Sequence, residues 1–126
     1  MSRMQPFEEL IAWQKARVLA RKVYELTRQE GLKSDFGLSR QMQRCAVSIM
    51  SNIAEGYERG TDGAYLRFLS IAKASCAEIR SQIYLAYDIG YLEQSQFTLI
   101  LEQAQEVGRI LGGLRAYIRK RREAKG

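Results

Sequence analysis

The polar side chains best suited to chemistry lie in the stretch SIMSNIAEGYERG, which runs from Ser48 to Gly60. Asn52, Glu55 and Arg59 bring an amide, a carboxylate and a guanidinium into about two turns of an expected helix. That combination has the polarity of a binding or catalytic site. The stretch offers no partner group that would complete a known reaction, so packing is the alternative interpretation.

Small residues are frequent in the same stretch, as is typical of a place where helices approach closely. Asn52 would then be a polar group at the edge of the core that fixes the register of the helices through hydrogen bonds. We favour this packing interpretation over ligand binding. The residues that would admit a neighbouring backbone or a large ring such as Trp13 are Ser48, Ser51, Ala54 and Gly56.

The absence of histidine excludes more chemistry than any residue present suggests. Without an imidazole there is no Ser-His or Cys-His pair and no histidine-ligated metal. Cys45 and Cys76 are far apart and have apolar neighbours, so we interpret them as small core residues and not as a disulfide or a zinc site. No glycine-rich loop follows a strand in the manner of a phosphate-binding motif. We therefore expect no enzymatic activity, no metal and no cofactor.

Basic charge is concentrated near the C-terminus. Residues 1–108 contain thirteen basic and thirteen acidic residues, so the net charge of +6 arises in the rest of the chain. Some cations there would complement a helix dipole, but fewer would suffice for that purpose. We predict contact with RNA, DNA or another polyanion, without sequence-specific reading, through Arg109, Arg115, Arg119, Lys120, Arg121, Arg122 and Lys125.

Four helices are predicted to position these residues. A chain of 126 residues with one proline and few β-branched residues favours a single all-α domain over residues 1–126. Apolar residues recur at spacings of three and four over residues 7–30, 35–59, 62–90 and from 95 onward. Asp62 and Ser95 would cap helices, and Gly31 and Gly90 would end them. The last helix is expected to fray in RKRREAKG.

Helices of about 24 residues joined by short connections favour an antiparallel up-down-up-down four-helix bundle. The second helix is the ambiguous one, because its stripe of Leu38, Met42, Cys45 and Ile49 can continue in two ways. Heptad spacing places Asn52 and Gly56 in the core, whereas spacing by fours places Ile53 and Tyr57 there. We interpret this as a shift of register within SNIAEG.

Aromatic and glycine residues point to contacts outside one narrow core. Seven tyrosines and Trp13 are many for a bundle of this size, and such residues are enriched at subunit interfaces. The alternative is ordinary partial burial with the hydroxyl groups in water. Gly108, Gly112 and Gly113 each cost up to about 1 kcal/mol in a helix interior relative to alanine, so close approach of another helix is the expected compensation.

The N-terminal stretch MSRMQPFEEL lacks the apolar segment of a signal peptide. No stretch approaches the roughly 18 uncharged residues that a membrane helix needs. We therefore expect a cytoplasmic protein with no membrane partner.

The segment RCAVSIMSNIAEGYERG resembles the signature of bacterial four-helix-bundle proteins encoded in intervening sequences of 23S ribosomal RNA genes, once called a ribosomal protein family. The family pattern usually has proline where this chain has Met50, so this helix is expected to be straighter than in its relatives. The similarity also covers, in order, FEELIAWQKARVLARKVYELT, FLSIAKASCAEIRSQIYLAYDIGYL and EVGRILGGLR.

The resemblance implies the bundle, a homo-oligomer that is commonly a pentamer in this family, and no known catalytic activity. Five basic tails around one axis would form a basic ring. Three hypotheses follow: a homo-oligomer that binds RNA or DNA, an accessory subunit for the reverse transcriptase of a diversity-generating retroelement, and a protein-interaction scaffold without nucleic acid. The second is drawn from resemblance alone, because those accessory proteins share the bundle.

Overall fold

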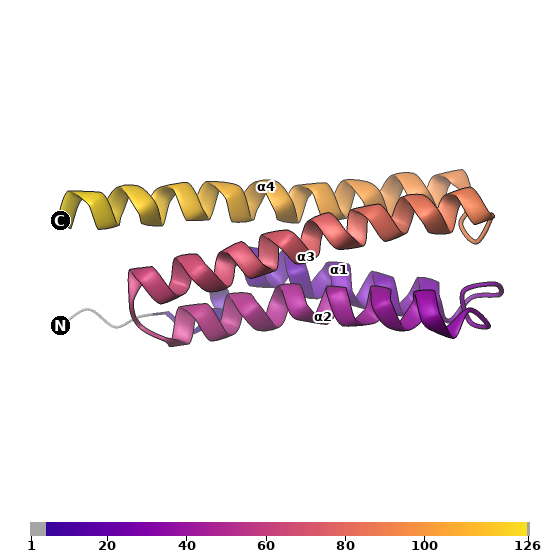
Figure 1. The fold of residues 1–126 in the computed structure, drawn as a ribbon, viewed down its shortest axis with the longest axis horizontal. Coiled ribbons are helices and arrows are strands. Elements are labelled where there is room, and N and C mark those ends of the chain that lie inside the picture. Colours follow the sequence, from indigo (N-terminus) through magenta and orange to yellow (C-terminus); the bar gives the residue numbers. More distant parts are fainter. Residues whose placement is uncertain (1–4, 126) are drawn as a thin grey trace.

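The structure is a computed structural model that describes residues 5–125. It consists of a short 3-10 helix, η1 (Phe7–Glu9), followed by α1 (Ile11–Thr27), α2 (Phe36–Glu58), α3 (Asp62–Ile89) and α4 (Gln94–Lys125). Successive helices run in opposite directions, so α1 begins at the same end of the molecule at which α4 ends (Figure 1). α1 and α3 each pack against both α2 and α4. The prediction of an all-α, antiparallel up-down-up-down four-helix bundle is confirmed.

The core of the bundle follows the predicted stripes on α1, α3 and α4. The apolar residues that repeat by threes and fours on α1 and α3 are buried, and Leu19, Leu69 and Ile79 have no exposed surface. On α4 the core extends from Ile100 to Ile118. Burying one Leu or Ile side chain stabilises a fold by about 1.5–3 kcal/mol, so this shared core holds the four helices together.

The core stripe of α2 differs from the prediction. Its buried residues step regularly by threes and fours, so no shift of register occurs within SNIAEG. Leu38 and Cys45 are only half-buried, and Ala46 occupies the core in place of Cys45. The prediction failed because it followed the larger apolar side chains, whereas the core of α2 includes small ones. The buried residues are Ser39, Met42, Ala46, Ile49, Ile53 and Gly56.

The helix predicted over residues 7–30 is shorter than expected at both ends. Leu10 has extended dihedral angles, φ −69° and ψ 128°, and separates η1 from α1. α1 ends at Thr27, because the loop after it turns back and places its own Leu32 in the core, where this side chain is completely buried. Gly31 lies in this loop with φ +89°, and a Cβ atom there would lie 2.6 Å from Cδ1 of Tyr91. This loop therefore requires glycine for its backbone conformation and for the close approach of the ring.

Thr61, and not Asp62, caps the N-terminus of α3. The Thr61 hydroxyl oxygen accepts a hydrogen bond of 3.2 Å from the Ala64 backbone N–H. Asp62 is the first helical residue, and its carboxylate is free to contact α4 instead. Gly90 ends the helix in a left-handed conformation with φ +96°, as predicted.

α4 begins one residue before the predicted cap, Ser95, and is the longest helix. The side-chain oxygen of Gln96 accepts a hydrogen bond of 3.0 Å from the Glu93 backbone N–H, which satisfies a donor at this helix end. Residues 119–125 of the segment RKRREAKG do not fray as predicted, because the helix continues through Lys125; Gly126 lies outside the described residues. Between residues 5 and 125, no helix combines the length and the apolar character that crossing a lipid bilayer requires.

Candidate nucleic-acid interface

The seven basic residues predicted to contact nucleic acid all lie on α4, but their surroundings differ. The side chains of Arg119, Lys120 and Arg122 are exposed and form no ion pair with another described residue. Arg115 is half-buried, and its Nε–H is buried without a hydrogen-bond acceptor in the described part of the chain. Arg109 is exposed near the middle of α4. Five of the seven cations are therefore unpaired within residues 5–125.

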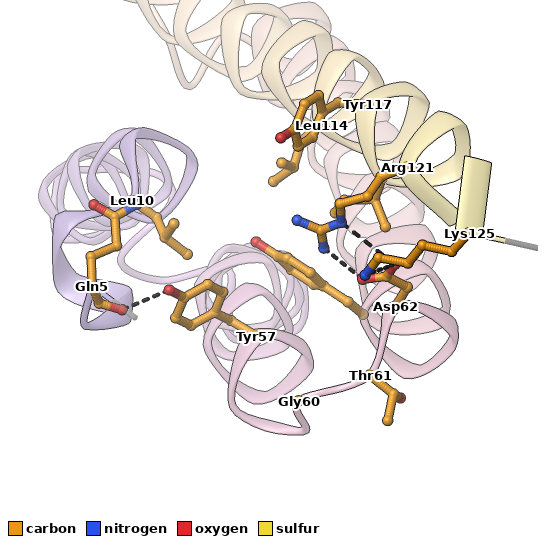
Figure 2. A pocket seen from close by; sticks show the side chains of 12 residues that line it. Gln5, Leu10, Tyr57, Gly60, Thr61, Asp62, Leu114, Tyr117, Arg121 and Lys125 are labelled. Atoms are coloured by element: carbon orange, nitrogen blue, oxygen red, sulfur yellow. Dashed lines mark hydrogen bonds and ion pairs between the residues drawn. The ribbon is translucent and has the colours of Figure 1, made fainter. Parts of the chain in front are cut away.

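The other two cations, Arg121 and Lys125, are held by Asp62 at the start of α3. Nη2 and Nε of Arg121 lie 2.5 Å and 3.4 Å from the carboxylate oxygens, and Nζ of Lys125 lies 3.6 Å from Oδ2 (Figure 2). The hydrogen bond from Arg121 lowers the pKa of Asp62, and the same bond raises the pKa of Arg121. These two cations can reach a phosphate only by sharing or releasing Asp62.

A basic groove lies between α3 and α4, near the middle of the bundle. Lys73 and Arg80 from α3 and Arg109 from α4 line a cavity of about 580 Å³. No acidic residue is among its described lining residues. Three positive side chains without a counter-charge make this groove attractive to an anion. Sequence reasoning missed Lys73 and Arg80; their spacing of seven residues, which places them on one helical face, was the available signal.

The glycines of α4 open this groove and do not admit a helix of the same chain. A Cβ atom at Gly108 or Gly113 would have no neighbouring atom of residues 5–125 within 4 Å. At Gly112 an added Cβ atom would lie 3.5 Å from Cε of Lys73, which is an ordinary van der Waals distance. Within the chain, the expected close approach of a helix at these three positions is therefore wrong.

Further cations continue from the groove toward the C-terminal end of α4. Gly112 faces Lys73, and the guanidinium of Arg122 lies against Gly63 of α3. Arg115 and Arg119 fall between these points at helical spacings of three and four, so they share this side of α4. We call this surface the basic seam; it comprises Lys73, Arg80, Arg109, Arg115, Arg119 and Arg122. Lys120 lies outside it.

The polar residues of SNIAEG do not converge on one site. Nδ2 of Asn52 donates hydrogen bonds to the carbonyl and hydroxyl oxygens of Ser48, at 2.8 Å and 3.0 Å. The Ser48 hydroxyl in turn lies 3.0 Å from that of Ser75, which joins α2 to α3. Glu55 and Arg59 form a separate, exposed ion pair of 2.9 Å. Asn52 thus supports helix packing, and it is not hydrogen-bonded to the ion pair.

Gly56 allows a close approach of α2 and α3. A Cβ atom added there would lie 2.6 Å from Cβ of Phe68 and 3.3 Å from Cδ1 of Tyr65. At Gly56 the large rings that come close are therefore those of Phe68 and Tyr65, while Trp13 packs edge-on against Phe7 with ring centroids 5.2 Å apart. This geometry supports packing as the role of the segment.

The two cysteines are free and differ in their surroundings. Cys76 is buried in the core as predicted, and burial raises the pKa of its thiol to about 11. Cys45 is half-buried, hydrogen-bonded to Glu78 and Gln82, and burial raises the pKa of its thiol as well. Neither thiol has the lowered pKa that makes cysteine a good nucleophile at neutral pH.

Residues 8–113 match the family described as 23S rRNA-intervening sequence protein. The chain belongs to this family. The match ends at Gly113, so Arg109 is the only sequence-predicted basic residue that lies within it. The other six lie on the remaining turns of α4. The basic C-terminal part of α4 is therefore a feature of this member that the family match does not cover.

The family fold is also seen in a solved structure. The chain is similar to a protein of unknown function from the S23 ribosomal protein family of Bacteroides thetaiotaomicron, with a TM-score of 0.77 and 21% sequence identity. The similarity covers 83% of this chain and 98% of that one. At this identity it shows a common fold. No curated protein sequence matches this member of the 23S rRNA-intervening sequence protein family.

Proposed function

We propose that this protein is a non-enzymatic homo-oligomer of the cytoplasm that binds RNA or DNA through the basic seam. The observation that carries the proposal is the groove lined by Lys73, Arg80 and Arg109, in which no described lining residue supplies a negative charge. Clustered cations repel one another, and a polyanion relieves that repulsion while releasing its own counterions.

The shape of the basic seam suits a phosphate backbone better than a single small anion. From Arg109 to Arg122 it follows α4 for roughly 20 Å at 1.5 Å per residue. Successive phosphates of one duplex strand are about 3.4 Å apart along the axis, so several fall within that length. Arg115 contributes a buried Nε–H that lacks an acceptor among the described residues. Such contacts position a nucleic acid without reading its bases.

Exposed apolar side chains support the oligomeric part of the proposal. Large apolar residues are exposed on all four helices, among them Ile11, Phe36, Ile71 and Leu99. A contact between copies would remove them from water, and the family resemblance favours a pentamer. Light scattering coupled to gel filtration should give a mass near five times that of the 14.5 kDa chain. A stable monomer at micromolar concentration would contradict this part of the proposal.

Fluorescence anisotropy with short RNA and DNA at several salt concentrations tests nucleic-acid binding. The seam variant is the triple replacement of Lys73, Arg80 and Arg109 by glutamine, which removes three charges and keeps a good helix former. We expect weaker binding and a salt slope that falls by about 0.7–0.9 for each phosphate that the variant no longer neutralises.

The matched control removes the same number of charges elsewhere, through glutamine at Arg21 of α1, at Arg28 directly after α1 and at Arg44 of α2, all of which are exposed. If both triple variants bind equally weakly, net charge and not the basic seam governs affinity, and the proposed site is wrong. If the unmutated protein binds no nucleic acid at about 50 mM salt, where electrostatic contacts are strong, the nucleic-acid function fails and the scaffold hypothesis replaces it.

A further inference from the structure

A second cavity lies at the end of the bundle where α2 leads into α3 and α4 ends. Its volume is about 450 Å³, within the range of small-molecule sites. Leu10, Tyr57, Leu114 and Arg121 surround the same space (Figure 2). Half of the lining residues are apolar or aromatic, and the others include Asp62 together with the cations Arg121 and Lys125.

Tyr65 lines this cavity and has a hydroxyl group that the fold leaves unsatisfied. The residue is only 7% exposed, and its hydroxyl is buried without a hydrogen-bond partner among residues 5–125. Tyr57, whose ring meets that of Tyr65 edge-on, instead donates a hydrogen bond of 2.6 Å to the Gln5 carbonyl. Because burial raises the pKa of Tyr65 to about 12, its hydroxyl remains a donor throughout the physiological range. A buried donor without an acceptor destabilises a protein, so an acceptor supplied by a ligand would be favourable.

The charged side of the cavity is formed by α4 and the start of α3. Arg121 lies over the ring of Tyr117, with 5.7 Å between Cζ and the ring centroid, and is bonded to Asp62. Lys125 shares the same carboxylate. Two cations against one acid leave a positive charge beside an aromatic wall. Stacking surfaces beside cations are the arrangement by which proteins bind unpaired bases and their phosphates.

We propose that this cavity receives one unpaired base of a single-stranded RNA or DNA whose backbone lies on the end of the basic seam. The inference rests on the proposed function. The base would stack against Tyr57 or Tyr117 and accept a hydrogen bond from Tyr65, while Arg121 and Lys125 contact an adjoining phosphate. The guanidinium of Arg122, at the end of the basic seam, lies against Gly63, the residue after Asp62 of the cavity lining, so a strand bound there passes the cavity. A base within a duplex is stacked and paired and cannot enter.

The substitution Tyr65→Phe tests this inference because it removes only the hydroxyl. Since the deleted donor has no partner among residues 5–125, thermal stability should stay the same or rise. Affinity for a short single-stranded RNA should fall by about 5- to 10-fold, the loss expected for one hydrogen bond, and affinity for a duplex should not change. Tyr84→Phe is the matched control: its side chain is exposed near the other end of α3, and both measurements should remain at the unmutated values.

A fluorescent base analogue, 2-aminopurine, placed within the single strand gives a second measurement. Its emission should rise on binding to the unmutated protein, because the base leaves the neighbouring bases that quench it, and should rise less with Tyr65→Phe. Equal affinity for single strands and duplexes, together with unchanged binding by Tyr65→Phe, would overturn the inference and leave binding along the basic seam intact. Absence of all nucleic-acid binding at low salt would refute the proposed function itself.

Discussion

Replacing Gly56 by alanine tests whether SNIAEG is a packing segment. The added Cβ would lie 2.6 Å from Cβ of Phe68, an atom held by the backbone of α3, and 3.3 Å from the ring of Tyr65. Neither α2 nor α3 can relieve the first contact by rotating a side chain, so the two helices must move apart. Overpacking of this kind costs about 1–3 kcal/mol.

Helix propensity acts in the opposite direction. Alanine is favoured over glycine in a helix interior by up to about 1 kcal/mol. The net effect of Gly56→Ala on the free energy of unfolding should therefore be a loss of about 1 kcal/mol, and Gly56→Val should lose more because it adds two further carbons. Urea denaturation would measure these losses, provided that the free energy of unfolding depends on urea concentration with the same slope in each variant.

Gly113→Ala is the control for this prediction. The substitution is chemically identical and lies within α4, but the added Cβ has no neighbour within 4 Å. It should raise the free energy of unfolding by up to about 1 kcal/mol. All variants must be compared at one protein concentration, because the stability of an oligomer depends on concentration. A Gly56→Ala protein as stable as Gly113→Ala would refute the packing interpretation.

Three further predictions concern single side chains. Asn52→Ala should lower the free energy of unfolding by about 1 kcal/mol and leave the nucleic-acid affinity of the folded protein unchanged. Thermal melting and fluorescence anisotropy on this one variant would measure both quantities. Reduced affinity without a loss of stability would favour the site interpretation. Because the pKa of Cys76 rises from 9.0 to about 11 on folding, its contribution to stability should be complete below pH 9 and should decline as the pH rises from 9 to about 11. Denaturation at about pH 8 and about pH 10 should show that the free energy of unfolding declines less in Cys76→Ala than in the unmutated protein. An equal decline in the two proteins would contradict a raised pKa of Cys76. Asp62→Asn should release Arg121 and Lys125, raise nucleic-acid affinity and steepen the salt slope by up to about 1.8, whereas an unchanged slope would mean that neither cation reaches a phosphate.

The bundle could be predicted from the sequence because its core depends on regular helical spacing. Large apolar residues repeat by threes and fours on α1, α3 and α4, and only one face of each helix can bury them. The same reasoning failed on α2, where Ser39 and Ala46 occupy core positions that a pattern of large residues does not reveal. The end of α1 was not predicted because it depends on Leu32. This residue of the following loop is buried in the core through contacts with residues distant in the chain.

The candidate interface was predictable only in part. The charge excess of α4 is evident in the sequence, but Lys73 and Arg80 belong to the interface only because α3 runs antiparallel to α4. Pairing of Arg121 with Asp62 joins residues far apart in the chain and depends on the same topology. The cavity around Tyr65 is less accessible still to sequence reasoning, since an unpaired hydroxyl has no signature in the sequence.

The geometry of α3 bears on whether the two parts of the proposed function, assembly and binding of a polyanion, are compatible in one small bundle. At 3.6 residues per turn, Ile71 and Lys73 are about 200° apart around the helix axis, and Leu85 and Ile89 fall on the side of Ile71 while Arg80 falls on that of Lys73. Ile71, Leu85 and Ile89 are about half exposed, at 45%, 49% and 50%. The apolar side and the basic side thus flank the buried stripe in opposite directions. An oligomer formed through the apolar side would leave the groove open, whereas one formed through the groove would bring like charges together; nucleic-acid binding and assembly through these two surfaces are therefore compatible.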